Sequence, residues 1–196
     1  MTEIFVLNCK ENRDFLLSQK DKISPARREK TAHAIKESAA LLNIGAEVIL
    51  SRALSLPMPI EYEKRQNGKP FIEGQRHFNL SHSGDYVLCA ISDFEVGADI
   101  EKKERMRLSI FKRIFSPAEK ERADALSGDA LKSYLCTVWT KKESILKMAG
   151  EGLRRNLREI CTETDGYFVY TTAFNEYVIS VCTEKKDEIK ITEIML

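Results

Sequence analysis

The sequence predicts an α+β fold made of two similar lobes. Candidate elements follow one another in the order helix, strands, helix, strands, which is expected of two α+β units in tandem. Ser-Pro-Ala followed by charged residues occurs at 24–30 and again at 116–122, which suggests a duplicated lobe. Chance is a fair alternative, because this tripeptide is a common way to begin a helix. The 196 residues suffice for a sizeable core, and we expect lobes 1–95 and 96–196.

The first lobe opens with a short predicted strand at residues 4–7. A long helix is predicted over about 25–54, because Ser24 and Pro25 form a typical helix start and apolar positions follow at Ala34, Leu41, Leu42, Val48 and Ile49. The segment 57–92 then contains strand-forming runs separated by Asn-Gly and by further glycines. It predicts strands joined by tight turns.

The second lobe opens with Val-Gly-Ala-Asp-Ile-Glu-Lys at 96–102, whose apolar and polar residues alternate. In a strand, Asp99 and Glu101 therefore lie on one face, where two like charges repel and raise each other's pKa. Helices are predicted at about 108–115, from Ser116 onward, and over 130–148. Strand-like runs at 166–183 and 188–196 close the chain.

The composition excludes several functional classes. The sequence is 43% hydrophobic and 31% charged, and its formal net charge of +1 gives no support to a nucleic-acid-binding protein. The five cysteines are scattered and form no C-x-x-C pair, which argues against a disulfide framework or a zinc site. The first residues are too acidic for a signal peptide, and no apolar run is long enough to cross a bilayer. We expect a cytoplasmic protein.

The segment Phe-Asn-Leu-Ser-His-Ser-Gly at 78–84 is the first candidate for chemistry. We expect a strand that runs into a tight turn and exposes Ser81, His82 and Ser83. Hydroxyl groups, an imidazole and free backbone N–H groups at such a turn can hold phosphate oxygens. The alternative is an ordinary hairpin turn with a surface histidine. A serine hydrolase is disfavoured, because the sequence contains no G-x-S-x-G motif.

The acidic strand and the helix at 139–147 are the other candidates. Asp99 and Glu101 suit Mg²⁺, which prefers oxygen ligands, but a solvent-facing strand edge is the simpler alternative. On a helix, Trp139, Glu143 and Lys147 share one face. They could be a core anchor and a stabilising ion pair, or Glu143 could bind the metal and Lys147 a phosphate. A divalent cation would turn the clustered carboxylates into ligands.

Together these segments resemble the signature motifs of the 4′-phosphopantetheinyl transferases of the two-lobed, surfactin-synthetase-activating type. The motifs occur in the family's order: ISPARREK at 23–30, NGKPF at 67–71, FNLSHSG at 78–84, VGADIEK at 96–102, FSPAEK at 115–120 and WTKKESILK at 139–147. The resemblance implies two pseudo-symmetric lobes, each a small, mainly antiparallel sheet packed with a long helix. It also implies an active site in the cleft between them.

The resemblance implies transfer of the phosphopantetheine arm of coenzyme A to a serine of an acyl or peptidyl carrier protein, with release of 3′,5′-ADP. Asp99, Glu101 and Glu143 would hold Mg²⁺. Glu143, or a water that it positions, would be the base. The other implied site residues are Lys147 at the pyrophosphate, Ser81 and His82 at phosphates, and Lys69, Arg27 and Lys30 at the nucleotide end and its 3′-phosphate.

One position departs from the family's pattern. Many members carry a basic residue near the position of Leu41 and Leu42 that reaches the adenosine, and this chain has leucines there. That contact is therefore absent or supplied from elsewhere, for which Arg52 is a candidate.

The segment 102–115, here called the docking segment, directly follows the acidic strand. Its cations are Lys102, Lys103, Arg105, Arg107, Lys112 and Arg113, and its interleaved apolar residues are Met106, Leu108, Ile110, Phe111, Ile114 and Phe115. A basic, partly apolar surface suits the acidic helix of a carrier protein. The alternative is a helix with its apolar side in the core and its cations in solvent.

Two other functions remain open from the sequence. A metal-dependent phosphohydrolase could use the same carboxylates, but it should cleave coenzyme A without a carrier protein. A homologue that binds carrier and coenzyme A without catalysis is disfavoured, because the three carboxylates, His82 and Lys147 are all present. We expect a monomer, since the lobe is duplicated within one chain.

Overall fold

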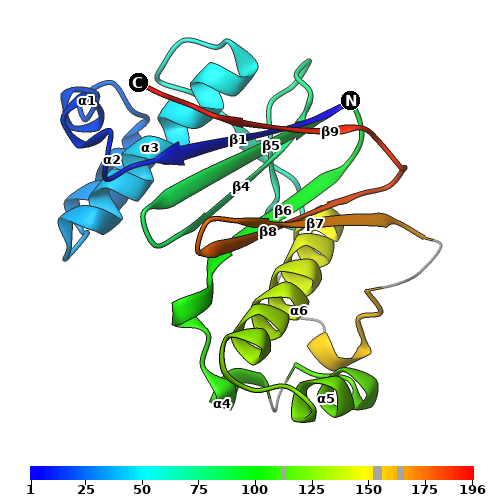
Figure 1. Ribbon diagram of the computed structural model, residues 1–196. Coiled ribbons are helices and arrows are strands. Elements are labelled where there is room, and N and C mark those ends of the chain that lie inside the picture. Colours follow the sequence, from blue (N-terminus) through cyan, green and yellow to red (C-terminus); the bar gives the residue numbers. More distant parts are fainter. Residues whose placement is uncertain (112–113, 152–155, 163–165) are drawn as a thin grey trace. The chain divides into compact units, whose positions relative to one another are not determined.

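The computed structural model describes residues 1–111, 114–151, 156–162 and 166–196 (Figure 1). The chain divides into two compact units. Unit 1 comprises Met1–Asp93 together with Asp187–Leu196, and unit 2 comprises Phe94–Lys186. Among the described residues, no helix is long and apolar enough to span a membrane.

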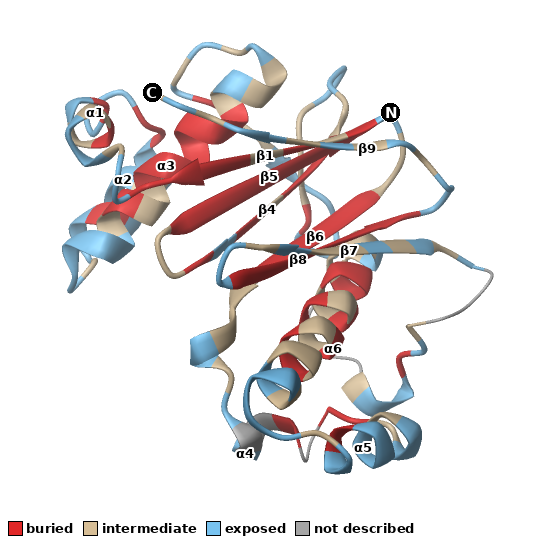
Figure 2. Ribbon diagram, in the orientation of Figure 1, coloured by how far each residue is buried: buried red, intermediate tan, exposed pale blue. Residues whose placement is uncertain are grey.

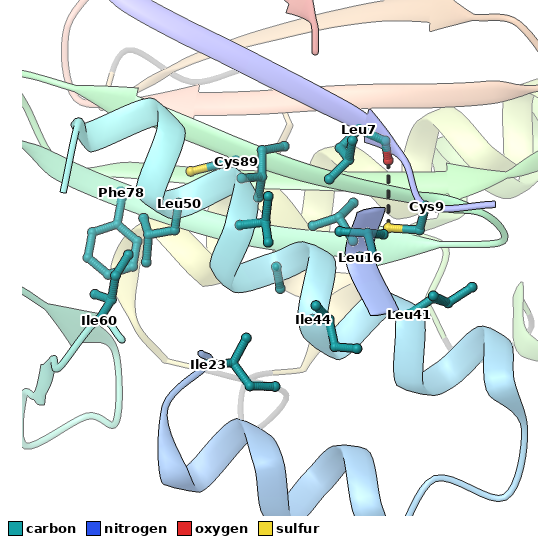
Figure 3. Packing of buried hydrophobic residues seen from close by; sticks show 14 of the residues in the cluster. Leu7, Cys9, Leu16, Ile23, Leu41, Ile44, Leu50, Ile60, Phe78 and Cys89 are labelled. Atoms are coloured by element: carbon teal, nitrogen blue, oxygen red, sulfur yellow. Dashed lines mark hydrogen bonds between the residues drawn. The ribbon is translucent and has the colours of Figure 1, made fainter. Parts of the chain in front are cut away.

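Unit 1 is a four-stranded sheet with helices packed on one face. The strands lie in the order β4 (His77–Ser83), β5 (Tyr86–Ser92), β1 (Thr2–Asn8) and β9 (Ile189–Glu193). The helices are α1 (Arg13–Ser18), α2 (Pro25–Ala32) and α3 (Glu37–Leu54), and a short hairpin consists of β2 (Glu63–Lys64) and β3 (Pro70–Phe71). Side chains of α3, among them Leu41, Ile44 and Leu50, pack with strand residues such as Leu7 and Cys89 (Figure 3).

The last ten residues correct the expected extent of the second lobe, which was 96–196. They belong to unit 1, because β9 pairs in parallel with β1, from Thr2 opposite Ile189 to Val6 opposite Glu193. The alternating pattern of residues 188–196 indicates a strand, but it carries no information about which sheet edge that strand will join.

The expected single helix over 25–54 is instead two helices, α2 and α3. In one straight helix, Ser24 and Glu47 would be separated by about 35 Å, at 1.5 Å per residue. In the structure the Ser24 hydroxyl donates to the Glu47 carboxylate at 2.6 Å. The chain therefore turns at residues 33–36, and α2 folds back beside α3. This turn lets α2 pack against α3, which in turn packs on β5 and β1 of the sheet.

Unit 2 is a three-stranded antiparallel sheet covered by one long helix. The strands lie in the order β6 (Val96–Lys102), β8 (Tyr177–Thr183) and β7 (Phe168–Phe174), and α6 (Gly128–Ala149) packs along β6 and β8. The shorter elements are η1 (Lys103–Arg105), α4 (Leu108–Phe111), α5 (Pro117–Asp124) and η3 (Leu157–Glu159). The strands β6 and β8 and the sheet-facing side of α6 are largely buried (Figure 2).

Two helix starts predicted from Ser-Pro are confirmed. Ser24 and Ser116 are the N-caps of α2 and α5, and Ser116 forms a full capping box with Glu119. Each of these helices has only eight residues, so neither motif opens directly into the long helix of its unit. Of the predicted helix at 108–115, the described residues form α4 at Leu108–Phe111, and residues 112–113 lie outside the described part of the chain.

The predicted α+β class is confirmed. Each unit contains a sheet and a long helix, α3 with 18 residues in unit 1 and α6 with 22 residues in unit 2. The ladders between the described strands are antiparallel apart from β1 with β9. The expected mainly antiparallel character therefore holds for each unit.

Candidate functional site

The acidic face of β6 is turned toward helix α6. Gly97 shows this directly, because a Cβ built on it would overlap the carbonyl oxygen of Ser144 and the backbone of Met148. A residue without a side chain is needed where two backbones approach this closely. Since side chains alternate along a strand, Asp99 and Glu101 lie on the same side as Gly97. The glycine thus brings α6 against the carboxylates.

Asp99 forms an ion pair with Lys147 of α6. The Lys147 Nζ lies 2.7 Å from Asp99 Oδ1, and it also donates to the carbonyl oxygen of Ala98 at 3.2 Å. Asp99 is only 5% exposed, which rules out the alternative of a solvent-facing strand edge for this residue. Because β6 and α6 come from distant parts of the sequence, only the fold brings the two residues together.

Glu143 lies one helical turn before Lys147 on α6, and its surroundings raise its pKa. Burial and the nearby charge of Asp99 raise its pKa to about 7, against the opposing effect of Lys147. Its Oε1 is buried and has no hydrogen-bond partner among the described residues. A carboxyl group in this environment can exchange a proton near neutral pH or accept a cation.

Glu101 lies at the other end of this face. Its Oε1 accepts a hydrogen bond from the backbone N–H of Lys102 at 3.2 Å. With Trp139 and Met106 it lines a small pocket of about 140 Å³, whose other lining residues are Arg105 and Phe111. Trp139, Glu143 and Lys147 therefore follow β6 along one side of α6, as their spacing predicts.

The expected three-carboxylate metal site remains a prediction. In the parts of the chain that the structure describes, no three His, Cys, Asp or Glu side chains are grouped closely enough to hold a metal ion. Asp99 and Glu143 nevertheless fit a hard cation, because the charge of Asp99 raises the pKa of Glu143 and, among the described residues, Glu143 Oε1 has no hydrogen-bond donor. Glu101 lies on the same face of β6 as Asp99, but among the described residues the three carboxylates are not close enough together to form a metal site.

The phosphate-binding turn expected at 81–83 is not a turn. Ser81, His82 and Ser83 are the last three residues of β4, and the turn to β5 follows at residues 84–85. Ser81 and Ser83 are buried, and only His82 is exposed. The seven-residue ladder with β5 continues to Ser83, which places the two serines on the sheet face opposite to His82.

The expected nucleotide-end cations all belong to unit 1. Arg27 of α2 is 12% exposed, and its Nε lies 3.5 Å from the Glu47 carboxylate. Lys69 follows the left-handed Gly68 in the β2–β3 hairpin and is 8% exposed, whereas Lys30 is exposed. At the position where this chain departs from the family's pattern, Leu41 is a buried core residue of α3.

The docking segment is basic at its surface and apolar in the core. Arg105 and Arg107 are exposed, and Lys102 pairs with Glu104 at 2.6 Å. Phe111, Ile114 and Phe115 are buried in a cluster with Leu135 and Val138 of α6, as expected from the alternative in which the apolar side lies in the core. Lys112 and Arg113 lie outside the described residues.

A sequence comparison decides the family. A 4′-phosphopantetheinyl transferase of Bacillus subtilis is 33% identical over 187 residues, which cover 84% of this chain and 84% of that protein. The chain belongs to the 4′-phosphopantetheinyl transferase family. It is an enzyme of this family, and the family model for the 4′-phosphopantetheinyl transferase superfamily matches residues 95–190, which contain all of β6 and α6.

Two further 4′-phosphopantetheinyl transferases show the same relationship. The transferase psf-1 of Bacillus pumilus is 31% identical over 75% of this chain and 71% of its own length. The transferase Sfp of Bacillus subtilis strain 168 is 33% identical over 67% of this chain and 62% of its own length. The crystal structure of Thermotoga maritima holo-[acyl-carrier-protein] synthase covers 47% of this chain and 64% of its own chain, with 16% identity and a TM-score of 0.40.

Two buried charged residues of this transferase, Lys142 and Glu47, are not among the candidates that the sequence indicates, although Lys142 lies within the WTKKESILK motif. Lys142 is fully buried and donates to Ile114 O, Glu119 Oε2 and Leu157 O at 2.7, 2.6 and 2.9 Å. Glu47 is 1% exposed and joins α3 to the start of α2. Helical spacing does place Lys142 on the side of α6 away from Asp99, but no sequence signal distinguishes a buried lysine from an exposed one.

Proposed function

We propose that this enzyme transfers the 4′-phosphopantetheine arm of coenzyme A to a serine of an acyl or peptidyl carrier protein in an Mg²⁺-dependent reaction. The observation that carries the proposal is the pairing of Lys147 with Asp99 beside Glu143, whose pKa is raised to about 7. This cluster provides a cation for phosphate and a base for a hydroxyl group in one place.

The proposed reaction is one displacement at phosphorus. The carrier serine oxygen attacks the phosphorus that bears the pantetheine arm, and a new P–O bond forms. The P–O bond to the nucleotide breaks, and 3′,5′-ADP leaves with the bonding electron pair. The serine proton passes to Glu143, directly or through a water. Such transfers depend on positioning and charge neutralisation more than on covalent catalysis.

In the metal-free chain, the pKa of Glu143 suits the role of general base. A base is most effective when its pKa lies near the working pH, because it must be ionised and yet accept a proton readily. Burial beside Asp99 produces this value. Lys147 supplies a fixed positive charge within reach of the pyrophosphate, and Asp99 fixes the position of its ammonium group.

Mg²⁺ is proposed to bind Asp99 and Glu143, with Glu101 as the third carboxylate. When bound, it would neutralise charge on the pyrophosphate. Residue roles in unit 1 are also proposals: Arg27, Lys30 and Lys69 at the nucleotide end and its 3′-phosphate, and His82 at phosphates. Ser81 is proposed to contribute there through its backbone, because its side chain is on the sheet face opposite to His82.

Carrier docking is proposed at the exposed cations of the docking segment. Reversing Arg105 and Arg107 to glutamate should raise the KM for an acidic carrier protein about tenfold or more and leave coenzyme A affinity unchanged. The matched control is reversal of two exposed lysines of unit 1, Lys20 and Lys190, which changes net charge equally. Equal effects of the two double variants would reduce the proposal to nonspecific charge attraction.

The deciding experiment is intact-protein mass spectrometry of an apo carrier protein incubated with enzyme, coenzyme A and Mg²⁺. A mass gain of one phosphopantetheine arm, lost with EDTA, would establish the reaction. Cleavage of coenzyme A without carrier would instead indicate a phosphohydrolase. Coenzyme A binding without any mass gain, across acyl and peptidyl carriers, would indicate a non-catalytic binding protein.

A further inference from the structure

Unit 1 contains one carboxylate whose burial needs an explanation. Glu47 of α3 is 1% exposed. Its Oε1 accepts the backbone N–H groups of Ser24 at 2.8 Å and of Ile60 at 2.9 Å, and its Oε2 accepts the Ser24 hydroxyl at 2.6 Å. Neutral donors alone do not offset the loss of solvation of a buried charge, so such a group is normally paired with a cation.

That cation is Arg27. Its Nε lies 3.5 Å from Glu47 Oε2, and its Nη1 lies 3.5 Å from the carbonyl oxygen of Asn43. Asn43 and Glu47 are four residues apart on α3, so one side of this helix contacts the guanidinium at two points, through an ion pair with Glu47 and a long hydrogen bond to Asn43. The Arg27 side chain is 12% exposed, so it is not fully enclosed by these contacts.

Arg27 is held over the same sheet face as His82. Arg27 belongs to α2, which packs against α3, and α3 packs on β5, where Cys89 belongs to the same core cluster. Cys89 is paired with Leu80 of β4, and Leu80 packs in the core beneath the helices. His82 lies two residues further along β4 and therefore on the same side.

We propose that Glu47 is a positioning residue for coenzyme A, which orients the Arg27 guanidinium toward the 3′-phosphate of the nucleotide. The inference rests on the proposed function, which assigns Arg27 to the nucleotide end. A free arginine side chain loses conformational entropy when it binds a ligand. An arginine that is already fixed by Glu47 and Asn43 loses less and binds more tightly.

Glu47→Gln isolates this role. The amide oxygen can replace Oε1 as the acceptor for Ser24 N–H and Ile60 N–H, and the amide NH₂ can donate to the Ser24 hydroxyl. The same NH₂ then faces Arg27 Nε, which is also a donor. The substitution therefore keeps the hydrogen bonds of the fold and removes the attraction that orients the guanidinium.

The test is isothermal titration calorimetry of the full chain in Mg²⁺ with coenzyme A and with dephospho-coenzyme A, which lacks the 3′-phosphate. Glu47→Gln should weaken coenzyme A binding about tenfold, equivalent to about 1.4 kcal/mol, and leave dephospho-coenzyme A binding within about twofold. In an Arg27→Ala background, Glu47→Gln should have no further effect on coenzyme A. In a Lys30→Ala background its full effect should remain, because Lys30 is exposed.

Further variants keep the result interpretable. Arg27→Lys retains the charge but not the planar contacts, and it should lose the same preference for coenzyme A over dephospho-coenzyme A even if Glu47→Gln does not fold. Ser24→Ala removes the hydrogen bond from the Ser24 hydroxyl to Glu47 and leaves the ion pair between Glu47 and Arg27 intact. It should lower stability without changing the preference for coenzyme A over dephospho-coenzyme A.

Each outcome has one meaning. Two results would overturn the positioning role of Glu47 without refuting the assignment of Arg27 to the 3′-phosphate. One is an equal loss of affinity for coenzyme A and dephospho-coenzyme A in Glu47→Gln, and the other is an undiminished effect of Glu47→Gln in the Arg27→Ala background. An unchanged ligand preference in Arg27→Ala itself would refute the assignment of Arg27. These titrations need no carrier protein, so a failure of the transfer reaction is detected separately.

Discussion

Lys147 and Asp99 form a 2.7 Å ion pair that joins the centre of β6 to helix α6. The pair is unequal in exposure, since the Asp99 side chain is 7% exposed and that of Lys147 is 27% exposed. Asp99 is thus fixed inside unit 2, and the lysine presents part of its charge to solvent. This geometry suits a lysine that binds an anionic ligand and a carboxylate that holds the lysine in place.

Removal of Asp99 should abolish transfer without unfolding the chain. Asp99→Ala leaves the ammonium group of Lys147 unoriented and removes a proposed metal ligand, so we expect the transfer rate to fall about a hundredfold or more. The rate is measured by the mass shift of the carrier, and folding by circular dichroism and thermal melting. Asp129→Ala, at an exposed carboxylate of α6, is the matched control. Near-wild-type transfer by Asp99→Ala would remove Asp99 from the site.

Glu143 should make the metal-free protein less stable as the pH rises. Its pKa is about 7 in the folded chain and 4.5 in the unfolded reference. Between these pH values the carboxyl group is therefore protonated to a greater extent in the folded chain than in the unfolded chain. The stabilisation that this proton provides is complete below about pH 4.5 and is lost as the pH rises through about 7.

The comparison with Glu143→Gln in EDTA separates this effect from other titrations. The melting temperature of the variant minus that of the wild type should be larger at pH 8 than at pH 5. At pH 8 the wild type must bury an ionised carboxylate, whereas glutamine carries no charge. A difference in melting temperature that does not change with pH would show that Glu143 ionises without cost.

Gly97 should tolerate no side chain. Gly97→Ala places a methyl group against the backbone of Ser144 and Met148, neither of which can move without shifting α6. We expect a loss of about 3 kcal/mol in the free energy of unfolding, measured with urea. Gly74→Ala is the control, because nothing lies within 4 Å of its Cβ position and only its positive φ of 75° is strained. That control should cost about 1 kcal/mol.

Lys142 should contribute strongly to stability, although it lies next to Glu143. Its Nζ donates three hydrogen bonds inside unit 2, one of them to the capping-box residue Glu119. Lys142→Met leaves that carboxylate unpaired and should cost about 3–5 kcal/mol.

Adding Glu119→Gln to Lys142→Met should restore part of the loss, because the unpaired charge is then gone. Lys120→Met, which breaks only the exposed pair with Asp124, should cost less than about 0.5 kcal/mol. If Lys142→Met were as mild as this control, the buried hydrogen bonds would not contribute to stability.

Local chemistry is what the sequence reveals well. The start of α5 is readable because Ser116, Pro117 and Glu119 satisfy the first turn by themselves. The alternation in β6 correctly predicts that Asp99 and Glu101 share a face, since that periodicity belongs to any strand. By contrast, nothing local distinguishes a turn at Ser81 from a strand that continues to Ser83, because pairing with β5 decides it.

By itself, the sequence determined the α+β class and the two Ser-Pro helix starts, and it indicated which residues of β6 and α6 are candidates for the proposed chemistry. Only the tertiary structure decided that residues 187–196 return to unit 1, that Glu47 holds Arg27, and that Lys147 reaches Asp99. The physical reason is distance along the chain. Periodicity and capping act within a few residues, whereas a buried charge pair forms between residues that only packing brings together.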